Sequence, residues 1–325
     1  MFSPVWLSDT FCLTPFSVAV CIAAISGCAM LYFQMRRHRL NDKAFAVLPV
    51  IVIVFSLLCG HILYALSHLW IDPYVTDTPV LFVLNPARGG FMFLGVIIGA
   101  MLACLITSSI SREPRRKLLN IVLPSILLML AFIRFAEPLD GQGRGPEAMS
   151  RFFPLSFAPE LDYPSDRYVP TFFYEGLYAL CLAVIGIQKN RIDRQQTWLR
   201  VLILYLAGQV FFEVMRVDEY VQTMSMITFV KLNQLFAVIM LAVILTAKAK
   251  AVCRTFGLKR YLLCWAVFAA SIGICIGFQF LLDKPLHMFG QIIFFPSWVV
   301  YIVLLLSAVG MGCALLHSLP RESEG

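Results

Sequence analysis

The sequence predicts an all-α membrane protein that crosses the bilayer about nine times. Three observations support this fold class. The 325 residues are 60% hydrophobic and only 14% charged, whereas soluble domains are about 45–50% apolar and about 25% charged. The mean hydropathy is +0.81, and the apolar residues gather in runs of about 20, the length that a spanning helix needs. Short segments between the runs carry most of the basic residues, as is typical of membrane proteins.

Nine apolar runs qualify as spanning helices by length and composition. They cover residues 14–35, 44–70, 90–110, 118–136, 171–187, 199–215, 227–247, 261–282 and 292–316. An odd number of spans places the two termini on opposite sides of the membrane.

Every second loop is basic, and this pattern sets the predicted orientation. The four basic loops contain Arg36, Arg37, Arg39 and Lys43; Arg112, Arg115, Arg116 and Lys117; Lys189, Arg191, Arg194 and Arg200; and Lys248, Lys250, Arg254, Lys259 and Arg260. Cytoplasmic loops carry an excess of Lys and Arg, so these four loops are predicted to face the cytoplasm. The N-terminus and the segments 71–89, 137–170, 216–226 and 283–291 then lie outside, and the C-terminus lies inside.

The formal net charge of +7 does not indicate a nucleic-acid partner, because the basic residues lie in short clusters between apolar runs. The 10 cysteines form no Cys-x-x-Cys pair and mostly lie inside the apolar runs, where cysteine behaves as a small hydrophobic residue. They indicate neither a disulfide framework nor a zinc site. We therefore expect no metal and no cofactor.

The stretch 134–146 is the strongest candidate for a functional site. Arg134 and Glu137 follow the apolar run 118–133 directly, and ionisable groups at such a place are costly unless they are paired or hydrated, which marks them as functional candidates. Alternating glycines from Gly141 to Gly145 let the backbone fold tightly and bring peptide N–H groups and Arg144 close to an anionic ligand. This pattern predicts a polar site at the membrane edge.

Two more charged residues are predicted to lie at the outer face of the membrane. Arg88 opens the third span on the side opposite to most of the positive charge, which favours either an anionic partner such as a lipid headgroup or a simple interfacial anchor. Glu175 lies about one turn inside the fifth span, where it is either a site residue or a cap that interacts with the helix dipole. The outer loop 137–170 is long and aromatic, which predicts a binding loop that rests on the membrane interface.

Patterns inside two spans predict contacts with other helices. Gly95 and Gly99 are four residues apart, a small-residue spacing that lets helices approach closely. Four polar residues of the sixth span share one helical stripe: Tyr205, Gln209, Glu213 and Arg216. A polar stripe in lipid must face protein or water, so it either lines a site or contains a buried Glu213–Arg216 pair that only positions helices.

Short motifs, in order over residues 1–250, resemble the prolipoprotein diacylglyceryl transferase family. The segment 59–64 is similar to the family's Gly-Ala-Arg-x-x-Tyr, and Arg88-Gly89-Gly90 is similar to its His-Gly-Gly. The segment 134–145 resembles the signature Arg-x-Gly-Asn-Phe-x-Asn-Gly-Glu-x-x-Gly. Three residues match this signature: Arg134, Gly141 and Gly145.

Two later motifs extend the resemblance, and five positions depart from it. Pro170, Tyr174 and Glu175 match the family's His-Pro-x-Gln-x-Tyr-Glu. Tyr205, Glu213 and Arg216 match its Tyr-Gly-x-x-Arg-x-x-x-Glu-x-x-Arg. The departures are Arg88 for a histidine, Glu137 for an asparagine, Gln142 for a glutamate, Val169 for a histidine and Gln209 for an arginine. They indicate an altered lipid donor, an altered acceptor or lost catalysis.

The resemblance implies a core, an activity and partners. The family usually has seven helices, so residues 1–250 are expected to form a seven-helix transferase-like core and residues 251–325 a two-helix extension that is dispensable for chemistry. The family moves a diacylglyceryl group from phosphatidylglycerol to a lipoprotein cysteine. The expected partners are therefore phosphatidylglycerol or a related anionic phospholipid and a lipobox-containing prolipoprotein, at the bacterial inner membrane.

The resemblance also suggests roles for the candidate residues. Arg134 is expected to clamp the phosphate, and Glu213 or Glu137 to accept the proton of the cysteine thiol, since the thiolate is the nucleophile. The expected lipid-binding residues are Arg88, Gly89, Gly90, Gln142, Arg144, Gly145, Tyr174, Glu175, Tyr205, Gln209 and Arg216. The alternative is a divergent, non-catalytic paralogue that holds a phospholipid or a partner membrane protein in the same cavity.

Cysteine-accessibility labelling tests the predicted orientation. A membrane-impermeant maleimide added to intact cells should label cysteines introduced within 137–170, and should label those within 111–117 only after the cells are opened. The unaltered chain, with its own 10 cysteines, measures the background. Labelling of both segments from one side would contradict the nine-helix arrangement.

Overall fold

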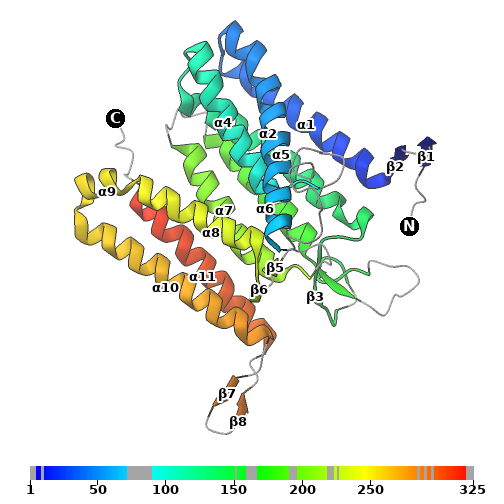
Figure 1. Cartoon of the computed structure of the whole chain (residues 1–325), viewed down its shortest axis with the longest axis vertical. Helices are drawn as coiled ribbons and strands as arrows, with labels where there is room; N and C mark the ends of the chain where they lie inside the picture. Colours follow the sequence, from blue (N-terminus) through cyan, green and yellow to red (C-terminus); the bar gives the residue numbers. More distant parts are fainter. Residues whose placement is uncertain are drawn as a thin grey trace. The chain divides into compact units, whose positions relative to one another are not determined.

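The structure is a computed structural model that describes residues 5–8, 11–71, 90–150, 152–158, 167–189, 196–217, 223–224, 227–283, 286–288, 291–293 and 296–319. Helices dominate it (Figure 1). They are α1 (Pro15–Arg37), α2 (Asp42–Ile71), α4 (Phe93–Ser111), α5 (Arg115–Ala136), α6 (Thr171–Lys189), α7 (Thr197–Met215), α8 (Leu232–Ala247), α9 (Ala249–Phe256), α10 (Leu258–Asp283) and α11 (Ser297–Ser318). In these ranges eight helices are long and apolar enough to cross a membrane, and α8 with α9, bent by 50°, would make a ninth span. The predicted all-α polytopic fold is confirmed.

Short hairpins, which the sequence did not predict, lie between some of the helices. The antiparallel pairs are β1 (Val5–Ser8) with β2 (Phe11–Leu13), β3 (Arg144–Glu147) with β4 (Tyr168–Pro170), β5 (Thr223–Met224) with β6 (Ile227–Lys231), and β7 (Leu286–Met288) with β8 (Gln291–Ile293). Strand β6 occupies the start of the predicted span 227–247, and β8 the start of the predicted span 292–316. The run 227–230 contains β-branched and aromatic residues, which favour a strand. Pro296 caps α11, so that helix begins at Ser297 rather than at 292.

The first of two compact units comprises Met1–Leu66, Thr78–Val201 and Met215–Val221. Its central helix is α5, which packs against α1, α4 and α6. Every residue of α5 from Leu118 to Leu127 is buried, as expected for a helix that is apolar on all sides. The polar Asn120 in this run accepts a hydrogen bond of 2.8 Å from the backbone N–H of Trp198. The packing of α5 against these helices fixes the position of its C-terminal end, which carries Arg134.

Helices α2 and α4 of this unit pack backbone against backbone. A Cβ atom built on Gly99 would lie 2.1 Å from the carbonyl oxygen of Phe55, and one on Gly95 would lie 2.4 Å from that of Cys59. Only glycine fits at such a distance. The packing interpretation of the small-residue pattern is therefore confirmed.

The second compact unit comprises Ser67–Asp77, Leu202–Val214 and Gln222–Gly325. In it α11 packs against both α10 and α8. Helix α11 also approaches α7, because a Cβ on Gly312 would lie 3.3 Å from the Cβ of Ala207. Helix α8, which the sequence groups with residues 1–250, thus belongs to the same unit as α10 and α11.

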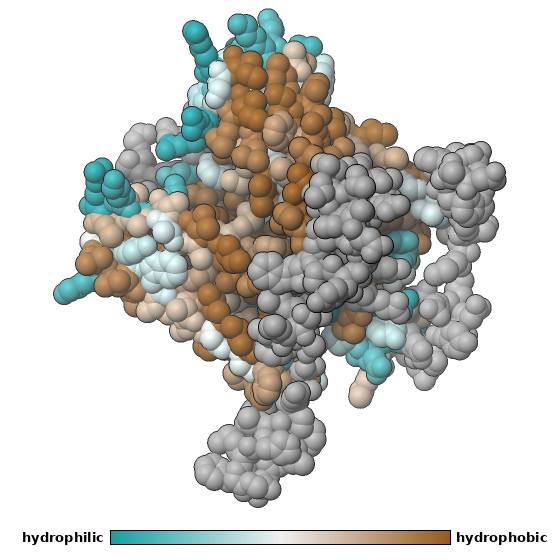
Figure 2. Space-filling model, in the orientation of Figure 1, coloured by the Kyte–Doolittle hydropathy of each residue, from teal (hydrophilic) through white to brown (hydrophobic). Residues whose placement is uncertain are grey.

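The surface of the first unit has an apolar belt and a polar end. Figure 2 shows hydrophobic residues along the sides of α1, α2 and α4, and hydrophilic residues where α1 runs into α2 and where α4 ends. Ile25 of α1 and Val50 of α2 are among the large apolar side chains that are exposed there, a surface that lipid tails can cover. The backbone N–H of Asn41, in the first basic loop, donates to Glu113 Oε1, in the second basic loop, at 3.0 Å. The two loops therefore lie at the same end, as the predicted orientation requires.

Replacing a packed glycine tests the α2–α4 contact. Gly99→Ala should lower the midpoint of thermal unfolding in detergent, because an added methyl meets the backbone of α2 and overpacking costs about 1–3 kcal/mol. Gly273→Ala in α10 is the matched control, since nothing lies within 4 Å of its added Cβ, and it should be neutral or stabilising by up to about 1 kcal/mol. Equal midpoints for the two variants would contradict the contact.

Candidate functional site

Four charged side chains are buried together in the first unit. Arg134 (9% exposed) lies in the last turn of α5, and Glu137 (4%) opens the 3-10 turn η2 (Glu137–Asp140) that follows. Glu175 (1%) lies in the second turn of α6, and Arg216 (7%) directly follows α7. Charged residues are almost never buried so fully unless they are paired.

The four side chains form a closed ion-pair ring. Arg134 contacts Glu137 through Nη1 and Glu175 Oε1 through Nη2, the latter at 2.7 Å. Arg216 contacts Glu137 Oε1 through Nη2 at 3.1 Å and Glu175 Oε2 through Nη1 at 3.3 Å. Each carboxylate touches both guanidinium groups, so the charges sum to zero. This mutual compensation offsets much of the cost of taking four charges out of water.

Local sequence explains how α5 and η2 place the first two members. Arg134 lies in the last turn of α5, where a positive charge interacts favourably with the helix dipole. Glu137 ends that helix, and Pro138 then favours a tight turn instead of further helix. Gly143 adopts φ +81°, and a Cβ there would lie 2.5 Å from the Cβ of Phe172 and 3.1 Å from Glu137 Oε2. Glycine is thus required at 143 so that the backbone can pass beside the ring.

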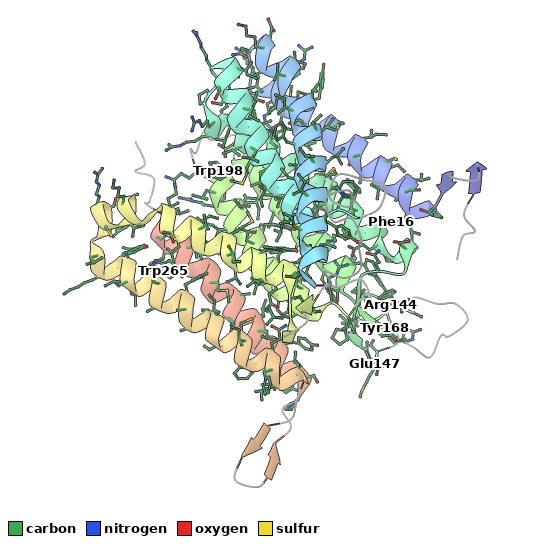
Figure 3. All side chains as sticks on the ribbon, in the orientation of Figure 1. Phe16, Arg144, Glu147, Tyr168, Trp198 and Trp265 are labelled. Carbon is green, nitrogen blue, oxygen red and sulfur yellow. The ribbon has the colours of Figure 1, made fainter. Side chains whose placement is uncertain are left out.

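The β3–β4 hairpin links the segments that carry the ring. β3 follows the glycine turn, and β4 leads directly into α6, so the pairing of Arg144 with Pro170 sets the start of α6 relative to η2. The backbone N–H of Val217, next to Arg216, donates to the carbonyl of Arg144 at 2.9 Å. Figure 3 shows Arg144, Glu147 and Tyr168 together at this hairpin. The hairpin therefore holds together the three segments that carry the ring, which are η2, the start of α6 and the residues after α7.

Other predicted site residues lie near the ring's supports rather than in the ring. Arg144 donates from Nε to the carbonyl of Gly141 at 3.0 Å, and its guanidinium lies 5.8 Å from the ring centroid of Tyr168. Gln142 donates to Asp140 Oδ2 at 2.9 Å. Tyr174 donates its hydroxyl to the carbonyl of Pro154 at 3.0 Å, in the outer loop.

The remaining predicted glycines are packed, or they lie outside the described residues. A Cβ on Gly145 would lie 2.4 Å from Thr171 Oγ1, and one on Gly90 would lie 3.1 Å from Tyr64 Cε2. Arg88 and Gly89 fall outside the residues that the structure describes.

The polar stripe of α7 is buried, as predicted. Tyr205, Gln209 and Glu213 are each buried. In the second unit, Glu213 Oε1 accepts a hydrogen bond of 3.1 Å from Asn233 Nδ2 of α8. Arg216 makes ion pairs with Glu137 and Glu175, so the stripe supplies a member of the ring as well as a separate hydrogen-bonded carboxylate.

Within the described ranges, no group of three or more His, Cys, Asp and Glu side chains is placed to hold a metal ion. The ring itself offers guanidinium and carboxylate groups, which can bind anions and transfer protons.

Sequence reasoning found the ring members but not their mutual contacts. Arg134 and Glu137 are one turn apart and were recognisable as a pair, whereas the contact of Glu137 with Arg216 joins residues 79 positions apart. The buried bond between Gln234 of α8 and Gln279 of α10 was also missed. In the sequence this bond is indicated only by one amide side chain within the apolar run of each of the two helices.

The comparisons with known proteins decide the family. A family model described as prolipoprotein diacylglyceryl transferase matches residues 4–249. The chain belongs to the prolipoprotein diacylglyceryl transferase family. A Bacillus licheniformis protein named phosphatidylglycerol–prolipoprotein diacylglyceryl transferase is 26% identical over 257 residues, which cover 76% of this chain and 91% of that protein. A protein of the same name from Bacillus velezensis is 27% identical over 216 residues, which cover 64% of this chain and 78% of that protein. Another from Listeria monocytogenes serotype 4b is 23% identical over 211 residues, which cover 63% of this chain and 75% of that protein.

The transferase family match ends before α10, so α10 and α11 lie beyond it. Three ring members stand at matched positions of the transferase motifs, namely Arg134, Glu175 and Arg216, and Glu137 stands where the signature has asparagine. The segments of this chain that resemble these motifs are far apart in the sequence and meet in one ring.

Removing one carboxylate tests the stability of the ring. Glu175→Gln should lower the free energy of unfolding by about 3–5 kcal/mol, because removing one partner of a buried pair leaves an uncompensated charge. Glu147→Gln, on the exposed end of β3, is the control and should change it by less than about 0.5 kcal/mol. Thermal unfolding in nanodiscs measures both, and equal loss in the two variants would contradict the structural role of the ring.

Proposed function

We propose that this chain is a bacterial inner-membrane enzyme that moves a diacylglyceryl group from phosphatidylglycerol to the cysteine thiol of a lipobox-containing prolipoprotein. The family match and the names of the relatives support the reaction and both substrates. At the level of residues, one observation carries the proposal. Two buried guanidinium groups, of Arg134 and Arg216, contact the same oxygen of Glu137.

Two arginines that share one oxygen suit a phosphodiester. A phosphate presents oxygens to guanidinium in the same bidentate way as a carboxylate, so the lipid phosphate can replace a carboxylate contact in the ring. The planar guanidinium is also weakly hydrated and stays charged when buried, which matters at the edge of an apolar helix. Arg134 and Arg216 are therefore assigned to the phosphate of the donor lipid.

The reaction exchanges one bond for another at the glycerol carbon of the donor. The thiolate sulfur attacks that carbon, a C–S bond forms, and the C–O bond to the phosphate breaks. The electron pair of the broken bond leaves with glycerol phosphate, whose added negative charge the two arginines stabilise. Such preorganised charges act more strongly in a water-poor site than in water.

The thiol proton needs an acceptor, and Glu213 is the better of the two candidates. Glu137 balances both arginines, so protonating it would open the ring. Glu213 accepts a bond from the neutral amide of Asn233 and precedes Arg216 by three residues in the chain. We therefore assign the transfer of the thiol proton to Glu213.

The other predicted lipid contacts are assigned to the headgroup and to the outer loop. Gln142 and Arg144 border the glycine turn, and Tyr174 joins α6 to the outer loop. Gly90 and Gly145 allow close backbone approach. Arg88, Gly89, Tyr205 and Gln209 complete the proposed set on the basis of the resemblance.

A second candidate function is a non-catalytic paralogue that holds a phospholipid or a partner membrane protein. The closed ring favours it, because a self-compensating ring is a sufficient structural reason to retain Arg134, Glu175 and Arg216. The five departures from the family motifs favour it as well. Only an activity measurement separates the two candidates.

The deciding experiment incubates the purified protein with isotope-labelled phosphatidylglycerol and a lipobox peptide. Mass spectrometry should find the peptide heavier by one diacylglyceryl group on its cysteine. A peptide with serine in place of that cysteine is the control and should stay unmodified. Lipid binding without any modified peptide would instead support the non-catalytic paralogue.

Substitutions of Arg134 test the phosphate assignment. Arg134→Lys keeps the charge but loses the planar fork, so transfer should fall roughly ten- to a hundredfold, as expected for one charge-assisted bond. Arg134→Ala should nearly abolish both transfer and phosphatidylglycerol binding. Both variants are measured with the assay above and with a lipid-binding titration.

The control for this prediction is stability. If Arg134 only balances Glu137, the double variant Arg134→Ala/Glu137→Ala should recover the thermal stability that Arg134→Ala loses, and lipid affinity should not change in either. Unchanged affinity in a well-folded Arg134→Ala protein would rule out the phosphate contact.

A further inference from the structure

A buried amide pair joins α8 to α10 inside the second unit. Gln234 Nε2 donates to Gln279 Oε1 at 3.0 Å and lies 3.5 Å from Cys275 Sγ. Gln234 and Gln279 are 5% and 4% exposed. Both residues lie on helices that consist mostly of apolar residues. A buried amide without a partner is costly, and a hydrogen bond between helices fixes their relative position.

The residue before Gln234 makes a second polar contact, in which the α8 side chain is again the donor. Asn233 Nδ2 donates to Glu213 Oε1 of α7 at 3.1 Å. Asn233 and Gln234 are neighbours in the first turn of α8, so they point about 100° apart around the helix axis. One turn of α8 therefore bonds to α7 on one side and to α10 on the other.

The α10 side of this link lies outside the part of the chain that the family model matches. The match ends at residue 249, and α10 begins at Leu258. Glu213, in contrast, stands at a matched motif position. A residue of the C-terminal extension is thus connected to a motif carboxylate by two hydrogen bonds and one step along the backbone.

We propose that Gln279 is a positioning residue for Glu213: by bonding Gln234 it fixes the rotation of α8, so that Asn233 presents its amide to the Glu213 carboxylate. A rotation of α8 that breaks the bond to Gln279 also swings Asn233 away from Glu213. This inference rests on the proposed function, in which Glu213 accepts the thiol proton. It also revises the expectation that residues 251–325 are scaffold dispensable for chemistry.

The experiment compares three single variants of the full chain. Gln279→Met has a similar volume but removes the acceptor for Gln234. Gln279→Glu retains a side-chain oxygen at the same place. Ser271→Ala is the matched control, because Ser271 is a buried polar residue of α10 that packs against Gly310 of α11.

In the transfer assay, Gln279→Met should lower kcat about three- to tenfold, the size expected for one neutral hydrogen bond, and leave KM for phosphatidylglycerol within about twofold. Gln279→Glu should recover most of the lost kcat, and Ser271→Ala should behave as the unaltered chain. A purely structural role predicts equal loss in Gln279→Met and Gln279→Glu, or loss of folded protein without a change of kcat, and either result overturns the proposal.

A measurement without turnover separates failure of this proposal from failure of the proposed function. A double-mutant cycle combines Glu213→Met, which removes the acceptor of Asn233, with Gln279→Met and records the midpoint of thermal unfolding in nanodiscs. Linked residues should be non-additive, with the double variant losing less than the sum of the single losses. Additive losses overturn the link even if transfer is observed. Non-additive losses in a chain without transfer support the link and reject the enzymatic role.

Discussion

Oxygen Oε1 of Glu137 is in contact with both Arg134 and Arg216, and the rest of the first unit is arranged so that this can happen in apolar surroundings. Helix α5 is buried on all sides from Leu118 to Leu127 and carries Arg134 in its last turn. The glycine turn lets Glu137 fold back beside it, and the β3–β4 hairpin brings the start of α6 and the end of α7 to the same place. Each guanidinium stays balanced only while both carboxylates remain, because buried charge without a partner is strongly destabilising.

Much of this arrangement was predictable from the sequence, because hydrophobic length and local spacing are sequence properties. The spans, the close packing at Gly95 and Gly99 and the buried stripe of α7 all follow from patterns within one helix. The hairpins were not predictable in the same way, since β6 begins inside an apolar run that is also long enough for a helix. The contacts Glu137–Arg216 and Gln234–Gln279 join distant segments, and no local pattern specifies which buried polar groups will meet.

Two departures from the family signature, at Glu137 and Gln142, together exchange the positions of a carboxylate and an amide. The signature has asparagine and glutamate where this chain has Glu137 and Gln142, so the stretch still contributes one such carboxylate and one such amide, in exchanged order. The structure separates their surroundings: Glu137 is buried between two arginines, whereas Gln142 bonds to Asp140 at the exposed end of the turn. At these two positions the number of carboxylates is unchanged and only their order differs, whereas Asp140, where the signature has its second asparagine, adds a carboxylate.

The order in which the ring members are synthesised affects how the chain enters the membrane. Arg216 follows Glu137 by 79 residues, so α5 and α6 leave the ribosome before it with one guanidinium and two carboxylates. Until α7 is inserted, that set has one excess negative charge, which favours the headgroup region over the hydrocarbon interior. Arrival of Arg216 cancels this charge. The ring therefore reaches charge balance only once the sixth span is present.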